Sequence, residues 1–374
     1  MLHDRLRSLP SGLLPPLPSL RTVVAVPVKD EAERLPRLIK SLAAQRDPLG
    51  QPLGRGEVEV ILLLNNCCDE SERVAGMLQS RYPGLMLRVC SVELRGENAH
   101  VGRARQLAMD LAYARLRAAG AEQGLICTTD ADSCPAPDWV AQNTAEVASG
   151  ADFVGGRVAL CSAERAALSP EVRALYLLDL GYRRLIERLA DLYCPSAHDP
   201  YPRHHQHYGA SIAVTARTYA AAGGLPAVRC SEDVALKEAV EAIGGRVRHS
   251  DRVRVFTSAR HDGRAAGGLA SAFLFWEERA RSGEPVLVEP AWHAERRWAA
   301  AARRSAADDP VPARLARTPE PDEAGAGEPI RRVVAQLRAL TDSLHRMTLS
   351  ERLDRAFGLP APFASLCAHE TSPV

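Results

Sequence analysis

Apolar segments of strand length alternate with helix-patterned segments over the first part of the chain. Residues 22–28 form a β-branched run, and residues 31–45 then place leucine and isoleucine at helical spacing. The same unit recurs over residues 58–82, 85–119 and 125–148. Strands that are apolar throughout, joined by amphipathic helices, are typical of a sheet covered by helices on both faces. The sequence therefore predicts an α/β fold with a Rossmann-like, mostly parallel sheet flanked by helices.

A pair of carboxylates follows the fourth predicted strand. Asp130-Ala131-Asp132 comes directly after the mainly apolar residues 124–129. Ligands of such sheets bind beyond the carboxyl ends of the strands. Carboxylate oxygens suit Mg²⁺ or Mn²⁺, which complete their coordination with water and substrate phosphates. The triplet predicts a divalent metal site for a diphosphate substrate, and the alternative is a turn in which both side chains bind backbone N–H groups.

Composition excludes several classes of partner. The chain has 47 basic and 46 acidic residues, so its net charge of +1 provides no overall field for nucleic acid. Its nine cysteines are odd in number and lack a C-x-x-C pair, which favours reduced thiols. Neither a signal peptide nor a transmembrane run is evident. We expect a cytoplasmic protein.

Trp292, Trp298 and the nearby arginines predict a helix packed on the domain, with peripheral membrane contact as the alternative.

Several motifs, taken in order, resemble the inverting family 2 glycosyltransferases of the GT-A fold. The resemblance runs from about residue 21 to residue 268. Its pieces are Pro27-Val28-Lys29-Asp30-Glu31 (P-x-x-N-E), residues 60–69 (second strand and nucleotide-binding turn), Gly102 to Gln106 (G-x-A-R-N), Asp130 to Asp132 (D-x-D), Tyr208 to Ser211, Gly223 to Leu225, and Ser231 to Asp233 (x-E-D). The resemblance implies a GT-A fold and a hexosyltransferase-like enzyme.

The resemblance also implies roles for the acidic residues. Asp130 and Asp132 would bind the metal, with Asp130 also facing the ribose, and His261 is a candidate third metal ligand. Asp233 would act as the general base on the acceptor hydroxyl, which is typically worth about 10²- to 10⁴-fold in rate. The alternative for Glu232 and Asp233 is that both only complement the dipole of the helix that they begin.

Further residues are expected to bind the nucleotide sugar. Arg260 and Arg264 are candidates for bidentate pairing with the diphosphate. The other residues expected at this site are Pro27, Lys29, Glu31, Asn66, Arg105, Asp130 and Glu232. Asn65-Asn66 replaces the Asp-Asp that is usual in the family, so the nucleotide is not predicted.

The domain organisation follows from these patterns. We expect an N-terminal extension (1–20), a GT-A domain (21–298) with a nucleotide-sugar half (21–160) and an acceptor half (161–298), a flexible linker (299–328) and a helical C-terminal segment (329–374). The leading hypothesis is metal-dependent transfer from a nucleotide sugar to an unidentified acceptor, with inversion. A retaining GT-A transferase, a nucleotidyltransferase and a non-catalytic nucleotide-sugar-binding scaffold are the alternatives.

Overall fold

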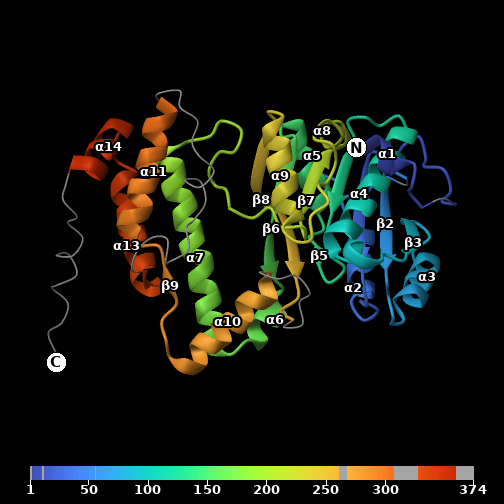
Figure 1. Cartoon of the computed structure of the whole chain (residues 1–374), viewed down its shortest axis with the longest axis horizontal. Coiled ribbons are helices and arrows are strands. Elements are labelled where there is room, and N and C mark those ends of the chain that lie inside the picture. The colour runs from blue at the N-terminus through green and yellow to red at the C-terminus, as the bar shows by residue number, and fades with distance from the viewer. Residues whose placement is uncertain (1, 11, 55, 261–267, 307–326, 359–374) are drawn as a thin grey trace. The chain divides into compact units, whose positions relative to one another are not determined.

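The computed structural model describes residues 2–10, 12–54, 56–260, 268–306 and 327–358. The chain divides into two compact units (Figure 1). Unit 1 comprises Met1–Ala166 and Gln206–Ser271, and unit 2 comprises Ala167–His205 and Ala272–Val374. The predicted halves, 21–160 and 161–298, do not coincide with these units, because unit 1 regains the chain at Gln206.

Unit 1 is built on an eight-stranded sheet with the order β3-β2-β1-β4-β7-β6-β8-β5. Its strands are β1 (Thr22–Val28), β2 (Val58–Asn65), β3 (Met86–Val92), β4 (Leu125–Thr128), β5 (Cys134–Pro135), β6 (Phe153–Leu160), β7 (Ile212–Thr215) and β8 (Val247–Thr257). The pairs β1–β2, β2–β3, β1–β4 and β6–β8 are parallel. β7 runs antiparallel to β4 and β6, and β5 runs antiparallel to β8. The predicted mostly parallel sheet flanked by helices is confirmed.

Helices cover both faces of this sheet. Those that contact its strands include α2 (Leu35–Ala43), α3 (Ser71–Arg81), α4 (Val101–Ala118), α5 (Trp139–Ala148), α8 (Ala216–Ala221) and α9 (Glu232–Ala242). The same part of the chain forms α1 (Leu2–Leu6), which packs on α4, the 3₁₀ turn η1 (Gly96–Asn98) and α6 (Ser162–Ala167). Alternate residues of β1 enter different cores: Val23 packs with Met109 of α4, whereas Val24 packs with Leu38 of α2. The alternation explains the uninterrupted apolar strands, because each strand supplies both faces.

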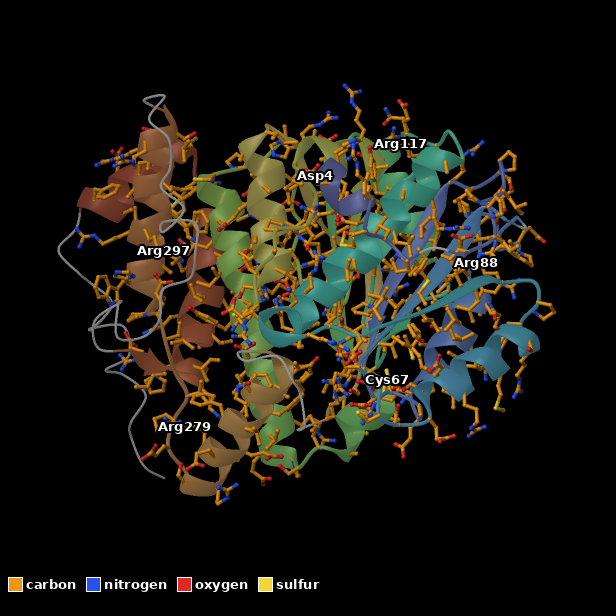
Figure 2. All side chains as sticks on the ribbon, turned by 45° about the vertical axis from the view of Figure 1, so that its right-hand side comes forward. Asp4, Cys67, Arg88, Arg117, Arg279 and Arg297 are labelled. Atoms are coloured by element: carbon orange, nitrogen blue, oxygen red, sulfur yellow. The ribbon has the colours of Figure 1, made fainter. Side chains whose placement is uncertain are left out.

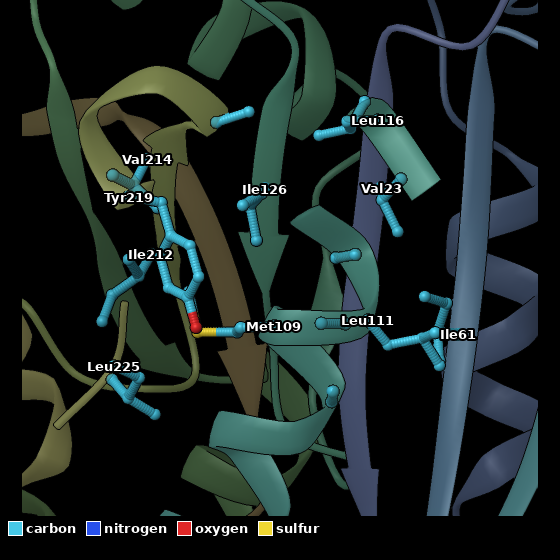
Figure 3. Packing of buried hydrophobic residues seen from close by; sticks show 14 of the residues in the cluster. Val23, Ile61, Met109, Leu111, Leu116, Ile126, Ile212, Val214, Tyr219 and Leu225 are labelled. Carbon is cyan, nitrogen blue, oxygen red and sulfur yellow. The ribbon is translucent and has the colours of Figure 1, made fainter. Parts of the chain in front are cut away.

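The α4 face of the sheet shows how these side chains pack (Figure 3). Val23 and Ile61 project from neighbouring strands toward α4, whose Leu111 and Leu116 meet them. Val23, Ile61 and Leu116 are fully buried, and full burial of such a side chain stabilises the fold by about 1.5–3 kcal/mol. This packing fixes α4, and α4 carries Arg105.

Unit 2 is largely helical. It contains α7 (Pro170–Tyr193), most of α10 (Leu269–Ser282), α11 (Ala291–Ala306), α13 (Ile330–Leu344), α14 (Leu349–Gly358) and a short antiparallel pair of β9 (Leu287–Val288) and β10 (Glu328–Pro329). α13 and α11 pack on α7. One face of α13 is buried, as Val333, Leu337 and Leu344 are each fully enclosed.

Two features of this region differ from the sequence-based expectation. α11 continues to Ala306, so the helix covers the first part of the segment predicted as a linker from residue 299, and residues 307–326 lie outside the described residues. Trp298 is buried but Trp292 is 39% exposed, so only one of the two tryptophans packs fully. Among the helices of the described residues, none has the length and apolarity to cross a membrane.

Candidate active site

The carboxyl ends of three parallel strands bring the predicted site residues to one edge of the sheet. β1 ends at Val28, β2 at Asn65 and β4 at Thr128, and in register Val28 pairs with Leu64. Glu31 and Asp130 therefore leave the sheet at the same edge, as predicted for the ligand side of such a fold.

Arg105 joins the two acidic motifs. Its Nη2 donates to Asp130 Oδ1 at 2.8 Å and its Nε donates to Glu232 Oε1 at 3.0 Å. Its Nη1 donates to Thr128 Oγ1 and to the Gly209 carbonyl, each at 3.0 Å. The side chain comes from the first turns of α4 and is 4% exposed. One buried guanidinium thus fixes the end of β4 to the start of α9.

Electrostatics and close packing hold Arg105 in place. Burial alone would lower the pKa of Arg105, but the charges of Asp130 and Glu232 raise it above its ordinary value, so the side chain stays charged. A Cβ at Gly209 would lie 2.7 Å from the Arg105 guanidinium. Only glycine lets the backbone approach so closely, which gives a physical reason for the glycine in the Tyr208-Gly209-Ala210-Ser211 motif.

Asp132 and Glu31 share a second arginine, Arg260, which follows β8. Arg260 Nη1 donates to Glu31 Oε1 at 2.6 Å, and its Nε lies 3.1 Å from Asp132 Oδ2. Ser258 Oγ donates to the same Asp132 oxygen at 2.9 Å. The side chains of Glu31 and Asp132 are 3% and 10% exposed. Burial and the nearby charge of Asp130 raise the pKa of Asp132, although Arg260 opposes this shift.

Asp233 lies at the start of α9, beside Glu232. Its Oδ2 accepts the Gly209 N–H at 2.9 Å and its Oδ1 accepts the Val234 N–H at 2.8 Å. Burial, and then the charge of Glu232, raise the pKa of Asp233. The contact with the Val234 N–H of α9 is of the kind expected of a helix-terminal carboxylate, whereas the Gly209 N–H comes from outside the helix. The raised pKa is suited to a base.

The chemistry of the donor set fits a divalent cation at Asp130 and Asp132. Within the described residues, the shorter hydrogen bonds of this pair use one oxygen of each, Asp130 Oδ1 and Asp132 Oδ2, while Asp132 Oδ1 has a 3.4 Å contact from Ser133 Oγ. Hard carboxylate oxygens next to solvent are what Mg²⁺ and Mn²⁺ prefer, and the side chain of Asp130 is 38% exposed. A cation would also offset the repulsion between the two carboxylates.

A second acidic group lies at the turns after β1 and β2. Ligand atoms of Asp30, Cys67 and Asp69 lie within 4.8 Å of one another, and Figure 2 labels Cys67. Both carboxylates already accept backbone N–H groups: Asp30 from Cys68, and Asp69 from Ala32 and Ser71. Their evident role is to shape the turns.

The remaining predicted residues have different environments. Pro27 is buried within β1, and Lys29 is exposed just beyond it. Asn66 donates to the Leu94 carbonyl and accepts the Leu94 N–H, so its amide holds a loop. His261 and Arg264 lie outside the described residues.

Sequence reasoning did not single out Thr128 and Ser258. Thr128 Oγ1 accepts a hydrogen bond from Arg105 Nη1, and Ser258 Oγ donates a hydrogen bond to Asp132 Oδ2. The signal in the sequence was weak: Thr128 is the last residue of an apolar strand, and Ser258 directly follows β8.

Comparison with protein families gives one clear match. Residues 23–199 match the family described as "Glycosyl transferase family 2". The match covers slightly less than half of the chain. The match confirms the predicted resemblance and, with it, the predicted enzyme class, a glycosyltransferase. It includes Arg105, Asp130 and Asp132 and ends before Glu232 and Asp233.

Comparisons with individual proteins give distant structural similarities. A sequence search of curated proteins finds no match. The chain is similar to the solved mannosyltransferase PcManGT of Pyrobaculum calidifontis with GDP-Man and Mn²⁺ (18% identity, TM-score 0.45, 94% of this chain and 90% of that chain). It is also similar to S. aureus TarS with UDP (14%, 0.44, 90% and 89%) and to glucosyl-3-phosphoglycerate synthase of Mycobacterium tuberculosis (17%, 0.39, 72% and 81%). At these TM-scores we infer nothing about this chain from them.

Proposed function

We propose that the chain transfers a sugar from a nucleotide diphosphate sugar to an acceptor hydroxyl, with inversion. The observation that carries this proposal is the Arg105 contact with both Asp130 and Glu232. It brings the D-x-D motif, which lies within the family match, next to the E-D motif, which lies beyond it. Inverting transfer needs leaving-group stabilisation and an acceptor base on opposite sides of one sugar, so these two motifs must be neighbours.

In this proposal Asp130 and Asp132 hold a Mg²⁺ or Mn²⁺ ion, with His261 as a further ligand. Such an ion acts as a Lewis acid for the leaving diphosphate, an effect worth several kcal/mol. Arg105 keeps Asp130 oriented, and Ser258 does the same for Asp132. Arg260 and Arg264 would pair with diphosphate oxygens, since a planar guanidinium matches two oxygens at once.

Asp233 is the proposed base. Its raised pKa strengthens it as a proton acceptor relative to an ordinary aspartate, and its two N–H contacts fix the carboxylate. The acceptor proton would pass to Asp233 as the hydroxyl oxygen attacks the anomeric carbon. Pro27, Lys29, Glu31, Asn66 and Glu232 complete the proposed donor site, Asn66 through the loop that it holds. The composition favours a cytoplasmic enzyme.

The test is binding followed by product analysis. We expect a common UDP- or GDP-sugar to raise the melting temperature only with Mn²⁺, because a ligand that binds the folded state stabilises it, by about 2.7 kcal/mol at a hundredfold excess over Kd. Asp132→Asn should abolish the shift. NMR should then find an inverted anomeric configuration in the product. A retained configuration would exclude the inverting mechanism, and no metal-dependent binding across the common donors would favour a scaffold.

A further inference from the structure

We propose that Arg260 is an internal counter-ion that competes with the divalent cation for Asp132, so that Asp132 is held in an ion pair until the cation binds. This inference rests on the proposed function and concerns the regulation of the same site. It assigns Arg260 a role before the donor arrives, in addition to the proposed contact with diphosphate.

The geometry places one guanidinium between two carboxylates. Arg260 donates to Glu31 at 2.6 Å and lies 3.1 Å from Asp132 Oδ2. Glu31 comes from the loop after β1 and Asp132 from the loop after β4, so Arg260 ties two strand ends to the end of β8. The Arg260 side chain is itself only 19% exposed. Charges this well covered are weakly screened by salt, so the pairing is effective.

The same charges make the pairing unfavourable once a cation is bound. A divalent ion on Asp132 would lie within a few ångströms of the Arg260 guanidinium, and like charges at that distance repel in a partly buried site. Both also draw on one carboxylate, which already accepts from Ser258. Binding of the cation alone must therefore loosen or displace Arg260.

Arg105 does not compete in this way. Its guanidinium makes four hydrogen bonds, to Asp130, Glu232, Thr128 and Gly209, and its side chain is 4% exposed. Arg260 Nε in contrast lies 3.1 Å from Asp132 Oδ2 in a side chain that is 19% exposed. A guanidinium that leaves Asp132 could instead take two oxygens of a diphosphate. Cation and nucleotide would then each favour binding of the other, since such coupling is reciprocal.

The experiment is a calorimetric titration of the full chain with Mn²⁺ alone. We expect Arg260→Gln to bind Mn²⁺ about tenfold more tightly than the unchanged chain, because the competing charge is gone. Arg260→Lys keeps a charge but cannot span both carboxylates, so we expect a smaller gain in the same direction. The Arg260→Lys variant also provides the test if Arg260→Gln fails to fold.

A control variant separates competition from general electrostatics. Arg34→Gln removes an equal charge that contacts Glu31 at 3.4 Å. It should change Mn²⁺ affinity by less than about threefold. Asp132→Asn should abolish binding, which shows that the titration reports on this site.

The outcomes distinguish this inference from the proposed function. Mn²⁺ affinity that is equal or weaker in both Arg260 variants would overturn the counter-ion role while leaving the metal site intact. If no variant binds Mn²⁺, with or without UDP or GDP, the metal site of the proposed function fails, and the counter-ion inference fails with it. A tenfold gain confined to Arg260 variants supports both.

Discussion

Two clusters of buried charge differ in their balance. The strand-end cluster of unit 1 contains Glu31, Asp130, Asp132, Glu232 and Asp233 with Arg34, Arg105 and Arg260. The helix cluster of unit 2 contains Glu289 with His293 and Arg297, and Glu295 with Tyr193 and Arg355. In the helix cluster each carboxylate has its own arginine, whereas in the strand-end cluster the carboxylates outnumber the arginines.

The difference indicates which cluster can bind a cation. Arg297 holds both oxygens of Glu289, at 2.9 Å each, and Figure 2 labels it on α11. A fully paired carboxylate gains nothing from a further cation and acts as a structural element. The excess of negative charge in the strand-end cluster is maintained against its electrostatic cost, which is typical of functional sites.

The largest effect on stability is expected at Arg105. Arg105→Met leaves the buried Glu232 and the partly exposed Asp130 without their cation, so the free energy of unfolding should fall by about 3–5 kcal/mol. Urea denaturation measures this loss. Arg117→Met, at an exposed position of the same helix (Figure 2), should change stability by less than about 0.5 kcal/mol. Equal effects of the two variants would show that Arg105 is not the link that we infer.

A smaller loss is expected at Arg297 in unit 2. Arg297→Met leaves one buried carboxylate, Glu289, without its arginine, so the free energy of unfolding should fall by about 3 kcal/mol. The exposed Arg296→Met is the matched control. Mn²⁺ affinity, measured on the folded variant, should not change, because the helix cluster is balanced. A change in Mn²⁺ affinity would break the distinction between the two clusters.

The smallest expected effect is on the pH dependence of stability. Burial raises the pKa of Asp233 in unit 1 and of Glu295 in unit 2. A raised folded-state pKa contributes stability that is fully present below the unfolded-state pKa and is lost as pH rises through the folded-state pKa. Asp233→Asn and Glu295→Gln should therefore gain stability relative to the unchanged chain as pH rises through that window. The gain is about 1.4 kcal/mol for each pH unit that separates the folded-state pKa from the unfolded-state pKa.

Urea denaturation at a series of pH values tests this sign. Glu238→Gln, an exposed position on α9, is the control for Asp233→Asn and should show a flat difference. If the stability difference of Asp233→Asn fell with rising pH, burial would not dominate at that residue.

Much of the sheet could be predicted because its signals are local. β1 has the predicted bounds, and the run before Asp130 ends within one residue of β4. Each apolar strand must be covered on both faces, so its pattern alone is sufficient. The antiparallel course of β7 between β4 and β6 is not encoded in this way, because a four-residue apolar strand looks alike in either direction.

The contacts that make the site are not local. Arg105 and Glu232 are 127 residues apart, and Arg260 and Glu31 are 229 apart. The sequence indicated each of these residues by its motif or its strand end, but their pairing depends on how the sheet brings those ends together. The amide of Asn66, predicted at the nucleotide, is engaged by Leu94, and nothing in the spacing of these two residues indicated that.

The rate of sugar transfer by the Asp233→Asn variant tests most directly the central claim, that Asp233 is the base. With donor and acceptor identified, single-turnover transfer should fall about 10²- to 10⁴-fold, because the acceptor hydroxyl loses its base, while Mn²⁺-dependent donor binding stays unchanged. Glu238→Gln, on the same helix, should transfer at the rate of the unchanged chain. Transfer by Asp233→Asn at that same rate would contradict the account and leave Asp233 as a helix-terminal carboxylate.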